Sequence, residues 1–227
     1  MPLHRTLRAA VVLGLGVVLY RVARERALGL GTTEAERMAP LPGDELLPGA
    51  DLVATRGIDV DAPPGDVWPW LVQMGQGRGG FYSYEALENL LGLDIHNADR
   101  VRPEWQDLAV GDEVRLAAQA GLVAAVVQPD EALVLQGAAP VPADELDSCG
   151  AEGTDVGPGQ GEAPFDFTWA FVLQPWGAHG TRLLVRERYR YRTSWAGRMV
   201  EPVSWVSLLM TERMLRGIRD RAEQSRG

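Results

Sequence analysis

The chain has 227 residues, 46% of them hydrophobic, which is enough for one folded domain with an appendage and excludes wholesale disorder. All 22 basic residues are Arg, and the net charge is −9. Beyond residue 26, the remaining 17 Arg and 30 acidic residues give −13. So acidic a domain argues against binding of nucleic acid, because the phosphates of a nucleic acid need a basic protein surface. The single cysteine, Cys149, excludes an internal disulfide and a Cys-based zinc site.

Residues 1–26 are predicted to form a hydrophobic helix. Ala9–Tyr20 is uncharged and strongly apolar, with arginines on both sides. If those arginines snorkel, the apolar stretch reaches Leu7–Ala23, near the lower limit of about 17–25 residues for a spanning helix. A signal peptide would want small residues where this chain has a basic flank, and a buried core helix is the other alternative. We expect a single N-terminal membrane anchor, of undefined orientation because both flanks are basic.

Residues 27–50 contain Gly, Thr, Pro and acidic residues and are predicted to be a linker arm. The folded domain is expected over residues 51–227 and begins with a β-branched strand, Leu52–Val60. Prolines end that strand, because proline lacks the N–H that a sheet needs. A helix is predicted to follow from Pro64 or Asp66 up to Met74.

Gly75–Gly80 interrupts this helix with four glycines in six positions. A second helix is predicted over Tyr82–Leu91, with Leu87, Leu90 and Leu91 as its buried stripe. Gly92 is expected to end it.

Apolar runs separated by Gly, or by Pro with Asp, predict antiparallel strands in the second half of the chain. These runs are Glu113–Ala117, Leu122–Val127, Ala132–Gln136, Phe165–Gln174 and Thr181–Thr193. Residues 137–164 hold six acidic residues, no Arg and many Gly and Pro, which indicates a long mobile loop. Glu201–Ser225 has the longest helical pattern. The expected fold is therefore α+β: a curved antiparallel sheet wrapped around a long C-terminal helix, with two short helices after the first strand.

Several motifs add a family resemblance. They are the APPGDVWPWL turn at Ala62–Leu71 and the segment MGQGRGGFYSYEALENLLGLDIHNAD at Met74–Asp99, together with Leu41–Pro48 and Glu201–Trp205. In this order they resemble the START/polyketide-cyclase-like (SRPBCC) superfamily, the helix-grip fold, and within it a bacterial subgroup with an N-terminal hydrophobic segment. The resemblance covers Leu52–Ala222 and implies a START-like ligand-binding domain with a cavity for a hydrophobic ligand. That superfamily includes lipid carriers, cyclases and pure binding modules, so the fold does not define an activity.

The glycine-rich turn has the composition of a phosphate loop, but a helix precedes it where a nucleotide-binding loop requires a strand. A tight turn between helices is the alternative, and Arg78 could also contact a polar head group. Phe81, Tyr82 and Tyr84 beside the turn suit a cavity mouth, although ordinary packing explains them equally well.

His96, Asn97 and Asp99 lie in the densest polar cluster. His96 could act as an acid or base oriented by Asp99. A loop whose side chains satisfy its own backbone is the simpler interpretation. Asp94, His96 and Asp99 lack the spacing of a metal motif, so no metal site is expected.

Thr181–Thr193 alternates sharply, with Glu187 and Tyr189 on its apolar side and arginines on the other. A buried carboxylate is costly unless it is paired, so Glu187 is expected to meet Arg78, Arg100 or a tyrosine hydroxyl. The alternative places Glu187 in solvent at the strand end. The arginine face could bridge acids of neighbouring strands or, with a membrane anchor, touch anionic lipid.

The predicted function is binding of a small hydrophobic molecule or lipid in an internal cavity at a membrane, with no cofactor and no nucleic acid. The predicted ligand-binding residues are Trp70, Gln73, Arg78, Phe81, Tyr82, Tyr84, His96, Asn97, Glu187 and Tyr189. One alternative is a cyclase- or isomerase-type enzyme that uses Glu187, His96 and Tyr82 for proton transfer. Another is an interaction module with an acidic recruiting loop. No catalytic residue is assigned, and the lack of a G-x-S-x-G motif excludes a serine hydrolase of that type.

Overall fold

The computed structural model describes residues 3–90, 92–118, 120–137 and 164–224, with side chains described from residue 13 onward. Within these residues, six strands form one antiparallel sheet in the order β1-β6-β5-β4-β3-β2. The strands are β1 (Leu52–Val60), β2 (Glu113–Ala117), β3 (Ala120–Gln128), β4 (Ala132–Gly137), β5 (Phe165–Trp176) and β6 (Gly180–Tyr191). Residues 138–163 of the predicted loop lie outside the described residues.

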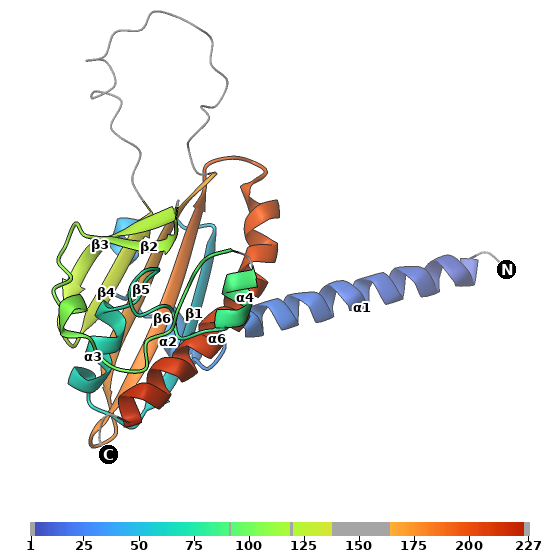
Figure 1. Cartoon of the computed structure of the whole chain (residues 1–227). Helices are drawn as coiled ribbons and strands as arrows, with labels where there is room; N and C mark the ends of the chain where they lie inside the picture. Colours follow the sequence, from blue (N-terminus) through green and yellow to red (C-terminus); the bar gives the residue numbers. More distant parts are fainter. Residues whose placement is uncertain (1–2, 91, 119, 138–163, 225–227) are drawn as a thin grey trace, which may run out of the picture.

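The described helices lie before β1, between β1 and β2, and after β6 (Figure 1). They are α1 (Leu3–Leu28), α2 (Glu34–Met38), α3 (Pro64–Val72), α4 (Glu85–Leu90) and α6 (Ala196–Gln224), with 3-10 turns η1 (Asp44–Leu46) and η2 (Pro103–Trp105). The long helix α6 crosses one face of the curved sheet, which we call the inner face, and α1 projects away from the body. The predicted α+β helix-grip architecture is confirmed.

The buried apolar stripe predicted for the second short helix is wrong. Leu87 and Leu90 of α4 are 42% and 81% exposed, whereas Glu88 is 3% exposed and accepts a hydrogen bond from the Ser83 hydroxyl. The helix spans six residues and does not begin at Tyr82 as predicted, because Tyr82 has a φ of 56°, a left-handed conformation that no right-handed helix accommodates. So short a helix at the rim of the fold turns its polar side inward. Leu91 lies outside the described residues.

The arm before β1 packs against the outer face of the sheet. Leu41 joins Val172 and Leu184 in a small buried cluster. The arginine face of β6 pairs largely with this arm: Arg182 Nε lies 2.7 Å from Glu36, and Arg186 Nη1 and Arg188 Nη1 lie 2.6 and 3.1 Å from Asp44. The remaining arginines, Arg190 and Arg192, pair with Asp166 on β5. These pairs account for the arginine face without lipid.

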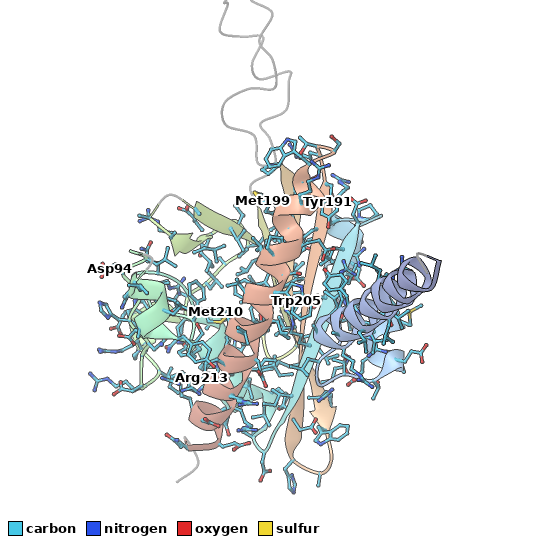
Figure 2. The ribbon with its side chains drawn as sticks, turned by 90° about the vertical axis from the view of Figure 1, so that its right-hand side faces the viewer. Asp94, Tyr191, Met199, Trp205, Met210 and Arg213 are labelled. Carbon is cyan, nitrogen blue, oxygen red and sulfur yellow. The ribbon has the colours of Figure 1, made fainter. Side chains whose placement is uncertain are left out.

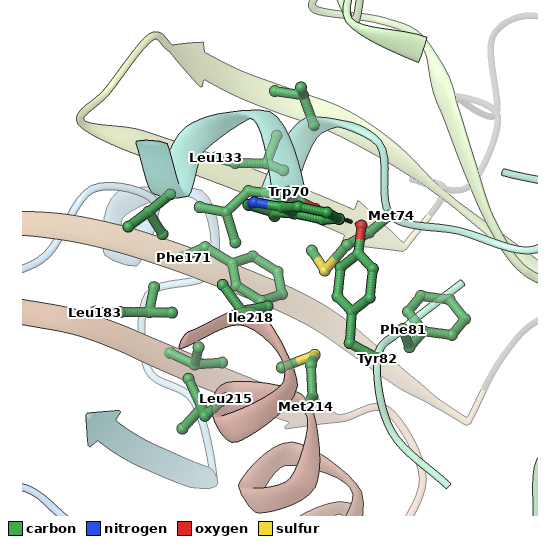
Figure 3. Packing of buried hydrophobic residues seen from close by; sticks show 14 of the residues in the cluster. Trp70, Met74, Phe81, Tyr82, Leu133, Phe171, Leu183, Met214, Leu215 and Ile218 are labelled. Carbon is green, nitrogen blue, oxygen red and sulfur yellow. Dashed lines mark hydrogen bonds between the residues drawn. The ribbon is translucent and has the colours of Figure 1, made fainter. Parts of the chain in front are cut away.

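The main core lies between the inner face, α3 and the second half of α6 (Figure 3). Trp70 of α3 lies over Phe171 of β5, and Met214 and Ile218 of α6 close the space from the other side. Each of these four side chains is at most 2% exposed. Among the described residues, none of the helices combines the length and apolar content needed to cross a bilayer, so the membrane anchor stays a prediction.

Candidate functional site

A buried ion pair lies at the other end of the inner face. Arg56 Nη1 of β1 is 2.9 Å from Glu187 Oε1 of β6, with the side chains 1% and 3% exposed. The strands are neighbours, and Glu187 lies opposite Ala54, two residues from Arg56. Because side chains two apart on a strand share a face, both charges point towards α6. Glu187 is therefore buried as expected, but its charged partner is Arg56 and not Arg78 or Arg100.

Helix α6 supplies further donors to the same carboxylate. The Ser207 hydroxyl lies 2.6 Å from Oε1, and the Thr211 hydroxyl donates to that oxygen at 3.0 Å. The Tyr189 hydroxyl donates to Oε2 at 3.3 Å. Burial, and then the nearby Glu187 charge, raise the pKa of Tyr189, so its hydroxyl keeps its proton. With these donors and a guanidinium around it, the Glu187 carboxylate acts as a fixed acceptor.

Next to the ion pair runs an aromatic wall, formed by Phe165, Phe167 and Trp169 of β5 with Tyr189 of β6. Phe167 and Tyr189 have ring centroids 4.7 Å apart, and Trp169 lies 4.8 Å from Phe171 and 6.1 Å from Phe81. The three β5 residues of the wall remain part-exposed although they face inwards, whereas Phe171 is fully buried. The difference arises because helices cover only part of β5. Helix α3 packs on β5 and β6 near Phe171, whereas α6 lies mainly over β1.

The wall also carries an unpaired donor. The indole Nε1 of Trp169 is buried, and it has no hydrogen-bond partner among the residues that the structure describes. An orphaned buried donor usually costs about 1–3 kcal/mol and calls for an explanation.

Most of the residues near the glycine-rich turn that were predicted to bind ligand instead form hydrogen bonds within the protein. Gln73 is fully buried and donates to the Tyr82 hydroxyl at 3.0 Å, and that hydroxyl donates to the Trp70 carbonyl at 3.0 Å. Burial raises the pKa of Tyr82. Asn97 Oδ1 accepts from the amides of Phe81 and Tyr82 at 3.1 and 2.6 Å.

The turn itself offers no phosphate cradle. The amides of Gly75 and Gly80 bond to each other's carbonyls at 3.0 and 3.1 Å, and the Gln76 amide donates to the Arg115 carbonyl at 2.8 Å. Arg78 donates to the carbonyls of Val72 and Trp105 at 3.0 and 2.7 Å. The tight-turn interpretation therefore describes this segment.

His96 and Tyr84 lie at the surface. The His96 side chain is 74% exposed, with Nδ1 3.1 Å from Glu85 and Nε2 3.3 Å from Asp94. Its orienting carboxylates are therefore these two and not Asp99. The hydrogen bond with Glu85 raises the pKa of His96. Among the described residues, no group of three His, Cys, Asp or Glu is placed to hold a metal ion.

The structure thus brings Glu187 and Tyr189 together and places Phe81 against Trp169 of the adjoining wall, whereas the side chains of His96 and Tyr84 lie at the surface. The sequence analysis missed Arg56, Trp169, Ser207 and Thr211. One signal was available: Ser207 and Thr211 are four apart on a helix and share a face. The role of Arg56 depended on which strands become neighbours.

No protein-family model and no curated protein matches the sequence. Among solved structures, the chain is similar to a norcoclaurine synthase point mutant from Thalictrum flavum, with 13% identity, a TM-score of 0.42, and coverage of 78% of this chain and 96% of that one. It is also similar to CalU16 from Micromonospora echinospora, with 16% identity, a TM-score of 0.34, and coverage of 76% of this chain and 84% of that one. For KanY the identity is 10%, the TM-score 0.43, and the coverage 78% of this chain and 99% of that one. These are helix-grip folds. At such identities and TM-scores, no functional property of these proteins is transferred to this chain.

Proposed function

We propose that the protein binds a small hydrophobic molecule bearing a polar acceptor group, and that this molecule lies against the aromatic wall. The observation that carries the proposal is the Trp169 indole N–H, which is buried beside a part-exposed apolar surface and has no acceptor within the described part of the chain. A ligand that displaced the side chains covering this N–H and placed an oxygen beside it would satisfy the donor, and the aromatic rings would cover the apolar part of the ligand.

The neighbouring polar cluster supports the same interpretation. Ligand sites are mostly apolar, with a few polar groups held in fixed positions. Ser207 is half-buried; its hydroxyl donates to Glu187 and accepts from Arg56 Nη1 at 3.4 Å, which leaves one lone pair that can accept a hydrogen bond from a ligand. The Arg56–Glu187 pair holds Ser207 in this orientation.

The geometry favours binding over proton transfer. The alternative cyclase or isomerase requires Glu187, His96 and Tyr82 to act together. His96 is on the surface, and the Tyr82 hydroxyl donates to a backbone carbonyl in the core. The Glu187 carboxylate is already engaged by Arg56, Ser207 and Thr211.

Two measurements on the full chain test the binding proposal. Solvent extraction and mass spectrometry of the purified protein should release an apolar molecule. Titration with prodan, a neutral fluorophore with a ketone acceptor, should show saturable binding that Trp169→Phe weakens about threefold to tenfold, the value of one hydrogen bond. Trp176→Phe on the exposed β5–β6 hairpin is the matched control, because Trp176 is 52% exposed. Equal prodan affinity in both variants, or no binding at all, would overturn the proposal.

We assign membrane attachment to α1. From Leu13 to Val22 its large apolar side chains are 40–70% exposed on all sides of the helix. Exposed apolar surface of this kind needs a partner, and a helix that is apolar all round suits lipid better than a protein groove. Ala9–Tyr20 would extend about 18 Å at 1.5 Å per residue, less than the roughly 30 Å hydrocarbon core. This length fits partial insertion. Retention of the protein on membranes after salt and carbonate washing supports the assignment, and release by either overturns it.

A further inference from the structure

We infer that the outward side of α6 is a second membrane contact, which rests on an anionic bilayer beside the point where α1 enters it. The inference builds on the proposed attachment of α1. Its core is the α6 ridge, which we define as Val203, Val206 and Leu209. These side chains are 43%, 54% and 57% exposed. Three-residue spacing places them along one side of the helix.

The ridge adjoins the root of α1. Tyr20 of α1 contacts Trp205 of α6 with ring centroids 6.4 Å apart, and Arg24 Nε lies 2.9 Å from Glu201 Oε2. Figure 1 shows α1 leaving the body on the side that carries α6. Figure 2 looks at that side: α6 runs down the middle of the view, and α1 comes towards the viewer beside it. A membrane plane perpendicular to α1 at its root would therefore lie along α6.

The charges around the α6 ridge indicate which partner it contacts. Arg21 and Arg26 at the root of α1, and Arg198 and Arg213 on α6, are exposed and have no ion-pair partner among the described residues. They form a basic border in a chain whose net charge is −9. Apolar side chains bordered by Arg, with Tyr and Trp at the junction, are typical of a surface that meets anionic lipid. A second copy docking through the same side would bring these arginines against one another.

Site-specific fluorescence on the full chain tests the inference. In a Cys149→Ser background, Leu209→Cys is labelled with the environment-sensitive dye NBD and mixed with vesicles of 70% phosphatidylcholine and 30% phosphatidylglycerol. The emission should shift to the blue and intensify. Leu15→Cys on α1 is the positive control, and Ala178→Cys on the exposed β5–β6 hairpin is the negative control.

The outcomes separate this inference from the attachment of α1. If position 15 responds and position 209 does not, the α6 contact is overturned and the attachment of α1 stands. If neither responds, both are overturned. A response at position 209 that rises with protein concentration and does not need vesicles would indicate a second copy on the ridge and overturn the lipid contact.

Substitutions provide an independent measurement. Val206→Asp with Leu209→Asp should lower vesicle partition about tenfold or more, because two apolar side chains lose their transfer from water. Val110→Asp, at a 64% exposed position outside the ridge, should leave partition unchanged. Arg198→Gln with Arg213→Gln should weaken binding to the anionic vesicles and have little effect with pure phosphatidylcholine. Equal partition of all variants would overturn the contact.

Discussion

Arg56 and Glu187 face each other across adjacent strands with 2.9 Å between Nη1 and Oε1, and both are shielded from solvent. Ser207 and Thr211 connect the same carboxylate to α6. One ion pair therefore joins β1, β6 and the long helix at the end of the sheet where the apolar core is least complete. This arrangement holds the side chains of Glu187 and Ser207 in fixed positions beside the aromatic wall.

Breaking this pair from one side should be strongly destabilising. Arg56→Met or Glu187→Leu alone leaves one buried charge without its partner, and each is expected to lower the free energy of unfolding by about 3–5 kcal/mol. The double variant should recover most of that loss, because no unpaired charge remains. Urea unfolding of the wild type, the two single variants and the double variant measures this double-mutant cycle.

The exposed pair Arg216–Glu212 on α6 serves as the control. Arg216→Ala should change the free energy of unfolding by no more than about 1 kcal/mol, as for other surface pairs. Single variants of the buried pair that unfolded like the wild type would contradict the account of this site.

Asp44 should hold the arm onto the outer face. Its two carboxylate oxygens bind Arg186 at 2.6 Å and Arg188 at 3.1 Å, and the Arg186 side chain is only 2% exposed. Asp44→Ala should lower the free energy of unfolding by about 2 kcal/mol or more, since hydrogen bonds to charged groups are lost around a buried guanidinium. Limited proteolysis should then cut the arm faster. Asp59→Ala, which removes the 52% exposed partner of Arg182, should have a much smaller effect.

Glu36 should make the arm sensitive to acid. Its hydrogen bond with Arg182 lowers the pKa of Glu36 from 4.5 to about 2. Because the folded-state pKa is the lower one, the stabilisation is complete above pH 4.5 and is lost as the pH falls towards 2. Stability measured by urea unfolding at several pH values should fall less steeply in Glu36→Gln over that interval. Parallel curves for the wild type and the variant would contradict this prediction.

Gly217 should be essential for the approach of α6 to the segment after the glycine-rich turn. A Cβ at this position would lie 2.3 Å from the Tyr82 carbonyl oxygen and 2.8 Å from the Tyr82 Cβ. Gly217→Ala should therefore destabilise the fold by about 1–3 kcal/mol, although alanine favours a helix. Gly14→Ala in α1, where a Cβ would meet nothing within 4 Å, is the control and should not lower the melting temperature.

Two kinds of residue pattern made the fold predictable. The alternation in β6 placed Glu187 on the inner face and the arginines on the outer face, because the strand period of two holds whatever the strand packs against. The helical spacing after residue 200 predicted α6, although the helix begins at Ala196. The stripe on α4 was wrong, since periodicity reports which residues share a face and not which face is buried.

The sequence by itself determined the elements, their order and the α+β class, because these follow from local spacing, turn residues and the sharing of faces. Only the tertiary structure decided the partners: that Arg56 meets Glu187, that the arm's acids meet the outer arginines, and that Trp169 finds no acceptor in the described ranges. Such pairs join residues as much as 146 positions apart. Their contacts depend on strand order and helix placement, which no local pattern encodes.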